Sequence, residues 1–112
     1  MSVIVNRLPS DYLAQGWCRG TMAKNAQGED VDPISPAATA WCLKGAIYAA
    51  HQGRANRIRS IAEFLDAIEA RVGDSTTSWN DEQCRGQDEA VAVAQDIEEV
   101  LGYTTVLGQN GD

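Results

Sequence analysis

The sequence predicts a mainly α-helical protein of the α+β class, a single small domain with three principal helices and a small N-terminal β hairpin or sheet. Its 112 residues suffice for one hydrophobic core but not for two. Three segments repeat apolar residues at three- and four-residue steps, the period of an amphipathic helix. We therefore expect one domain over 1–112, with an irregular or hairpin region at 1–34, a helical core at 35–101 and a C-terminal tail at 102–112.

The first third of the chain predicts short elements joined by turns. A short helix is expected over residues 10–15, because Pro9 precedes this stretch and Gly16 follows it. A tight turn is expected at Asn25–Gly28, whose glycine permits a positive φ, so that the flanking residues can form a small hairpin. Residues 3–5 form either a further strand, beside the C-terminal segment, or part of a helix.

The second helix is expected to begin at Ser35, with Pro36 in its first turn, and to end at Gly53. A glycine inside a helix costs roughly 1 kcal/mol relative to alanine. We therefore expect Gly45 to allow the close approach of another backbone or of the Trp79 ring. Its buried stripe would consist of Ala40, Leu43, Ile47 and Ala50.

The most regular pattern predicts a helix from Arg57 to Val72, with Gly73 as its C-cap. Its expected buried stripe is Ile58, Ile61, Leu65, Ile68 and Val72, widened by Ala62. A further helix is expected over Asp88–Leu101, ended by Gly102. Its apolar positions are Ala90, Val93, Ala94, Ile97, Val100 and Leu101. The adjacent acidic pair Glu98 and Glu99 is expected on the solvated surface, and residues 103–107 have a β-type composition.

The net charge of −7 is concentrated in the second half of the chain. Residues 1–56 hold five basic and four acidic side chains, whereas residues 57–112 hold four basic and twelve acidic ones. This balance disfavours direct nucleic-acid binding, which requires a clustered basic surface. The acidic half suits either solubility or a basic partner protein.

The remaining composition argues against metal, membrane and export. Cys18, Cys42 and Cys84 have no paired metal-ligand spacing, so neither a metal site nor a cofactor is expected. With no apolar run of membrane length and no secretory signal pattern, we expect a cytoplasmic protein with reduced thiols. On one shared helix, Cys42 and His51 would face opposite sides and form no catalytic dyad.

All three tryptophans lie in short motifs: Gly16–Gly20, Trp41–Ala46 and Trp79–Asp81. In this order they resemble a family of small bacterial and phage proteins known as domain of unknown function 6197. The resemblance covers roughly residues 12–100 and departs from the family pattern at Pro9 and in the tail after residue 101. The matching residues are Gly16, Trp17, Gly28, Trp41, Cys42, Gly45, Ala46, Trp79, Asn80, Asp81, Arg85, Glu89 and Val91.

The resemblance implies a shared fold and a shared polar patch, but no known activity. We expect this patch to bind a ligand or partner through Trp17, Trp41, Trp79, Asn80, Asp81 and Arg85. A structural role competes with this hypothesis, because an Asn-Asp pair also caps helices and closes turns. We favour a cap for Asp81 and a mixed role for Trp79.

Two functions fit the sequence. The first is a non-enzymatic binding protein, encoded by a phage or mobile element, that acts on a basic host protein or a small signalling ligand. Nucleic acid and membrane are not expected partners, and the oligomeric state is left open. The alternative is a small hydrolase or transferase that uses Asp81 or a cysteine, with a partner group brought near only by the tertiary fold.

Overall fold

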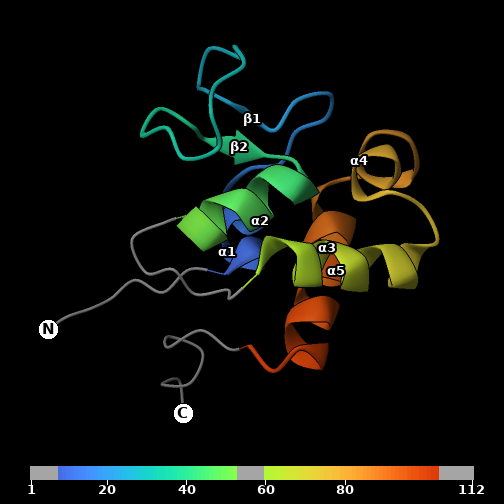
Figure 1. Cartoon of the computed structure of the whole chain (residues 1–112). Coiled ribbons are helices and arrows are strands. Elements are labelled where there is room, and N and C mark those ends of the chain that lie inside the picture. Colours follow the sequence, from blue (N-terminus) through green and yellow to red (C-terminus); the bar gives the residue numbers. More distant parts are fainter. Residues whose placement is uncertain (1–7, 53–59, 104–112) are drawn as a thin grey trace, which may run out of the picture.

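The structure, a computed structural model, describes residues 8–52 and 60–103 (Figure 1). It confirms a mainly α-helical fold with a small β element. Residues 3–5, the start of the helix expected at Arg57 and the tail after 103 lie outside the described residues. The elements are α1 (Pro9–Gln15), β1 (Ala23–Lys24), β2 (Ala40–Trp41), α2 (Leu43–Gln52), α3 (Ile61–Val72), α4 (Thr76–Ser78), the π-helical turn η1 (Trp79–Gln83) and α5 (Gln87–Val100).

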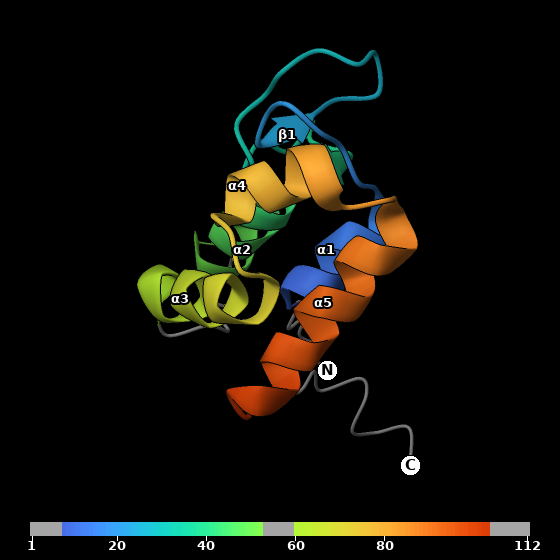
Figure 2. The same ribbon diagram turned by 90° about the vertical axis from the view of Figure 1, so that its right-hand side faces the viewer.

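The short helix α1 matches the prediction for residues 10–15 and packs against both α2 and α5. Figure 2 shows α1 and α5 side by side. The Asp11 carboxylate accepts the Leu8 backbone N–H at 2.8 Å and so satisfies one free donor at the start of the helix. Gly16 ends it by donating its N–H to the Tyr12 carbonyl.

The β element is an antiparallel pair, with Ala23 opposite Trp41 and Lys24 opposite Ala40. The predicted tight turn is present: the Asn25 N–H donates to the Glu29 carbonyl at 2.9 Å, and Gly28 has a φ of 81°. The segment after this turn forms no strand and meets β1 at an isolated bridge between Lys24 and Asp30. The strand that pairs with β1 is therefore β2, further along the chain.

The second helix begins at Leu43, so the predicted start at Ser35 is wrong. Asp32 and Ser35 form local turns instead: the Ile34 N–H donates to Asp32 Oδ1 and the Ala37 N–H to Ser35 Oγ, both at 3.0 Å. Such bonds compete with helix formation. Ala40, expected in the helical stripe, belongs to β2.

Gly45 sits where α2 touches the backbone of the loop before β1. A β-carbon at this position would lie 1.9 Å from the Met22 carbonyl oxygen. The reason for this mid-helix glycine is therefore the approach of another backbone, one of the two alternatives expected, and not the Trp79 ring.

In α3 the buried face differs from the predicted stripe. Phe64 and Ile68 are completely buried, Ile61 and Leu65 are half-buried, and Ala62 is exposed. Leu65 lies about 100° around the helix from Phe64, at the margin of the buried face. The predicted C-cap at Gly73 is confirmed, with a left-handed φ of 77°. The helix begins at Ile61, after the extended N-cap Ser60, and not at Arg57 as predicted.

The last helix, α5, matches the prediction within one residue at each end. Its inward side chains Ala90, Val93, Ala94 and Ile97 are buried as expected, but Val100 is 75% exposed. Glu98, expected in solvent, is only 5% exposed. The prediction for Glu98 is therefore wrong, because its carboxylate reaches a polar partner on α1, described below.

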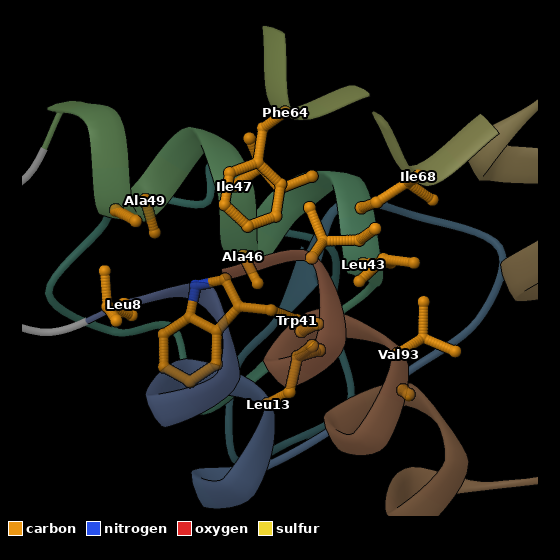
Figure 3. Packing of buried hydrophobic residues seen from close by; sticks show 14 of the residues in the cluster. Leu8, Leu13, Trp41, Leu43, Ala46, Ile47, Ala49, Phe64, Ile68 and Val93 are labelled. Carbon is orange, nitrogen blue, oxygen red and sulfur yellow. The ribbon is translucent and has the colours of Figure 1, made fainter. Parts of the chain in front are cut away.

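The core lies between α1, α2, α3 and α5 (Figure 3). Phe64 and Ile68 point from α3 toward Ile47 and Leu43 of α2, while the Trp41 indole lies near Leu8 and Leu13 at α1. The helix α3 thus packs against both α2 and α5. No helix within the described ranges is long and apolar enough to span a membrane.

Candidate functional site

The three tryptophan motifs meet at one place in the fold. Trp17 and Trp41 form an isolated parallel β-bridge. Two backbone hydrogen bonds hold it: the Trp41 N–H donates to the Gly16 carbonyl at 3.0 Å, and the Cys18 N–H donates to the Trp41 carbonyl at 3.1 Å. The third motif contributes Asn80, and we call these three segments the motif cluster.

Asn80 is the centre of the motif cluster and is completely buried. Its Oδ1 accepts the Trp17 indole N–H at 2.8 Å and the Leu43 backbone N–H at 3.0 Å. Its Nδ2 donates to the Cys18 carbonyl at 3.2 Å and to Asp81 Oδ1 at 2.9 Å. These four bonds use the full hydrogen-bonding capacity of the amide. Asn80 thereby links the Cys18 carbonyl to the first N–H of α2, where the two bridged segments separate.

The π-helical turn η1 presents this side chain. The Cys84 N–H donates to the Trp79 carbonyl at 2.8 Å, a five-residue spacing that is rare and occurs often at functional sites. Within the turn, Asp81 Oδ1 also accepts the Gly20 backbone N–H at 3.0 Å. Asp81 thus closes the Cys18–Gly20 loop onto η1, a contact that supports the structural role favoured for it.

Two of the three tryptophans are buried in the core. Trp41 and Trp79 are 4% and 6% exposed, and the Trp41 indole N–H is used by the Pro33 carbonyl at 2.9 Å. Trp17 is half-buried. The Arg19 guanidinium lies 4.7 Å from the Trp17 ring centroid and also donates to the Cys84 carbonyl at 2.6 Å. The surface of the motif cluster is therefore formed in part by Trp17 and Arg19.

Arg85, the last expected site residue, is exposed and near η1, not among the bonded groups of the motif cluster. Its backbone N–H donates to the Glu89 carboxylate at 2.7 Å, which fixes the entry to α5. Arg85 lines an open depression of about 570 Å³ together with residues 86–89. The structure thus brings five of the six expected residues together and leaves Arg85 at the edge.

The three cysteines are buried and reduced. Burial raises the pKa of the Cys18 thiol to about 11, and burial also raises the pKa of Cys42 and of Cys84. Cys42 lies just before α2, where its Sγ accepts the Gly45 N–H at 3.2 Å. A raised pKa keeps a thiol protonated near neutral pH, so the reactive thiolate is scarce at that pH.

A second polar site, which the sequence reasoning missed, joins α1 to α5. The Glu98 carboxylate accepts the Ser10 backbone N–H and the Ser10 hydroxyl, each at 2.7 Å. Burial raises the pKa of Glu98 to about 7, although the Ser10 bonds favour the charged form. Its position four residues after the buried Ala94 could have indicated the inward orientation. The adjoining groove of about 590 Å³ is lined by Leu8, Ser10, Asp11, Gln95, Glu98, Glu99, Gly102 and Tyr103.

Among the described residues, no group of three histidine, cysteine or carboxylate side chains is arranged to hold a metal ion.

The sequence model of a family of unknown function, DUF6197, matches residues 9–99. This range contains all three tryptophan motifs and both polar sites. No curated protein matches the chain. No solved structure matches it either.

Proposed function

Since the chain belongs to the family of unknown function DUF6197, we propose its function from its own surface: a small, non-enzymatic protein that binds a basic segment of a partner protein. The observation that carries this proposal is the exposed face of α5. Asp88, Asp96 and Glu99 fall within about 80° of one another around this helix and are exposed, and we call them the α5 acidic face.

The surrounding charges reinforce this face. Residues 60–103 contain eleven acidic side chains and two basic ones. One of the two, Arg71, bonds Asp96 at 2.7 Å in a half-exposed pair and so offsets one charge of this face. The other, Arg85, precedes the first turn of α5. A surface of one sign accelerates association with a partner of the opposite sign.

The motif cluster has a supporting role in this proposal. The bonds of Asn80 and Asp81 inside the fold favour scaffolding over direct recognition. A small-molecule ligand at Trp17 and Arg19 is the competing form of the binding hypothesis. Cytoplasmic location and a phage or mobile-element origin belong to the same proposal, and the reduced thiols suit the former.

A charge-reversal titration tests the proposal. The probe is a synthetic peptide rich in lysine and arginine, with a neutral peptide of equal length as its control. Glu99→Lys should weaken binding about three- to tenfold, because an attractive exposed charge becomes a repulsive one. Asp30→Lys is the matched control: Asp30 is also exposed but lies in the turn after β1. Equal effects of both reversals, or binding indifferent to salt, would contradict a role for the α5 acidic face.

A second candidate, a small hydrolase or transferase, rests on Glu98. A buried carboxyl with a pKa near 7 beside a groove is suited to proton transfer. Its partner Ser10 is brought near only by the tertiary fold, across 88 positions of sequence. An NMR titration of the Glu98 carboxyl carbon tests this candidate. A midpoint close to 4.5 would remove it.

A further inference from the structure

The dipeptide Trp-Cys occurs twice in the chain, and the fold places the two copies side by side. Trp17 and Trp41 are partners in the isolated parallel bridge, and Cys18 and Cys42 are the residues that directly follow it on the two segments. Neighbouring strands lie about 4.7–4.9 Å apart. A disulfide requires Cα atoms about 4.4–6.8 Å apart. The bridge therefore brings the two cysteines that follow it close to the spacing that a disulfide requires.

The two sulfur atoms also face the same piece of chain. Cys18 Sγ donates to the Thr21 carbonyl at 3.8 Å. The next carbonyl, that of Met22, accepts the Cys42 N–H at 3.1 Å and lies against Gly45, whose N–H in turn donates to Cys42 Sγ. After burial, the strongest influence raising the pKa of Cys18 is the neighbouring Cys42 thiol.

We propose that Cys18 and Cys42 form a reversible disulfide when the protein meets hydrogen peroxide, and that this pair is a redox switch within the motif cluster. Cys84 is not part of the pair, because its thiol donates to the Gly86 carbonyl at 3.2 Å, near the start of α5. It serves as an internal control. This inference is independent of the acidic face proposed above.

The reaction balances with one molecule of hydrogen peroxide. The Cys18 thiolate attacks a peroxide oxygen, the O–O bond breaks, and after proton transfer Cys18 sulfenic acid and one water result. The Cys42 thiol then attacks the Cys18 sulfur, the S–S bond forms, the S–O bond breaks and a second water leaves. Two thiols are oxidised by two electrons in total. A dithiol reductant reverses the change by exchange.

The raised pKa of Cys18 sets the rate. Since the thiolate is the attacking species, oxidation is slow at neutral pH and accelerates about tenfold per pH unit on the way to about 11. Bond formation also changes the fold locally. Cys42 Sγ leaves the Gly45 N–H at the start of α2, one residue from the Leu43–Asn80 bond. Oxidation should therefore alter the fluorescence of Trp17 and Trp41.

The test uses the full chain carrying Cys84→Ser, with Cys84→Ala as a second background. Hydrogen peroxide at mildly alkaline pH should convert both thiols into a disulfide within one chain. The mass should fall by two hydrogen atoms, no dimer should form, and dithiothreitol should restore the thiols. Adding Cys18→Ser or Cys42→Ser should abolish this intramolecular product. In the wild-type chain, digestion should yield the Cys18 peptide linked to the Cys42 peptide.

A second experiment uses refolding, because buried thiols in the folded protein are poorly accessible to an added oxidant. The Cys84→Ser chain is equilibrated with glutathione redox buffers, once in native buffer after refolding and once in urea. We compare the ratio of reduced to oxidised glutathione at which half of the chain carries the disulfide. This ratio should be at least about tenfold higher in native buffer than in urea, because the native fold favours the disulfide. Equal or greater reduction in native buffer than in urea would overturn the proposal, as would a linked peptide that contains Cys84.

Discussion

At the scale of single residues, Asn80 decides the stability of the motif cluster. Its removal leaves the Trp17 indole N–H, the Leu43 N–H and the Cys18 carbonyl without their partner. Each buried polar group left unpaired costs about 1–3 kcal/mol. Asn80→Ala should therefore lower the free energy of unfolding by at least about 3 kcal/mol in urea titrations. The control is Glu82→Ala in the same turn, whose exposed side chain should change it by less than about 0.5 kcal/mol. A small effect of Asn80→Ala would return this residue to the set of ligand-binding candidates.

Glu98 gives a pH dependence with a definite sign. Its pKa rises from 4.5 in the unfolded chain to about 7 in the folded protein. Between these values the folded state holds a proton that the unfolded state releases, so stability from this group falls as pH rises and levels off above about 7. The shift corresponds to roughly 3 kcal/mol.

Glu98→Gln isolates this contribution. The variant cannot ionise at this position, so the stability of wild type relative to Glu98→Gln should fall by roughly 3 kcal/mol between pH 4.5 and 7.5. Chemical denaturation at several pH values measures it, and Glu99→Gln at the exposed neighbour should show no comparable trend. A constant difference between wild type and Glu98→Gln would mean that the folded protein does not raise this pKa.

At the scale of elements, Gly45 fixes the distance between α2 and the loop before β1. Alanine favours a helix by about 1 kcal/mol over glycine, but here its β-carbon would lie 1.9 Å from the Met22 carbonyl oxygen. Moving the two backbones apart should cost more than this gain in helix propensity. We therefore expect Gly45→Ala to lower the free energy of unfolding by about 2 kcal/mol or more. Gly86→Ala is the matched control, because nothing lies within 4 Å of its added carbon. Equal melting temperatures for both variants would contradict this packing account.

The revised phase of α3 is tested by two neighbouring side chains. Phe64 is completely buried, whereas Leu65 is half-buried at the margin of the same face. Phe64→Ala should cost about 3–5 kcal/mol, and Leu65→Ala should cost clearly less than the loss typical of a fully buried leucine. Urea denaturation of the two variants shows which face of the helix is buried. A larger loss at Leu65 would restore the stripe predicted from the sequence.

How well each element could be predicted depended on the range of its contacts. The C-terminal end of α3 and both ends of α5 followed from local signals, such as Gly73 and the apolar period. The start of α2 did not, because Ser35 and Pro36 resemble a helix start, whereas β2 pairs with β1 and with Gly16 by long-range bonds.

The candidate sites were predictable to different degrees for the same reason. The three motifs identified the residues that meet around Asn80, but not the four bonds that occupy it. The buried Glu98 was missed because its partner Ser10 is distant in sequence, and carboxylates are rarely buried without a partner.

At the scale of the whole molecule, the uneven charge should oppose folding. The net charge is −7, and twelve of the sixteen acidic residues follow residue 56. Self-repulsion between exposed charges is screened over about 10 Å at 0.1 M salt. Raising sodium chloride from a low concentration to about 0.5 M should therefore increase the free energy of unfolding. The gain should be about 1 kcal/mol or less for each pair of exposed acidic side chains whose repulsion is screened.

The location of this repulsion can be measured with the variants that test binding. Glu99→Lys replaces one charge of the α5 acidic face, so it should raise the melting temperature at low salt and flatten its salt dependence. Asp30→Lys makes the same change in the first half of the chain, which carries little net charge, and should do so less. A surface that lowers stability yet is needed for the basic peptide is retained for binding, since groups selected for function often oppose folding. Equal salt dependence in both variants would show that the α5 acidic face carries no special repulsion.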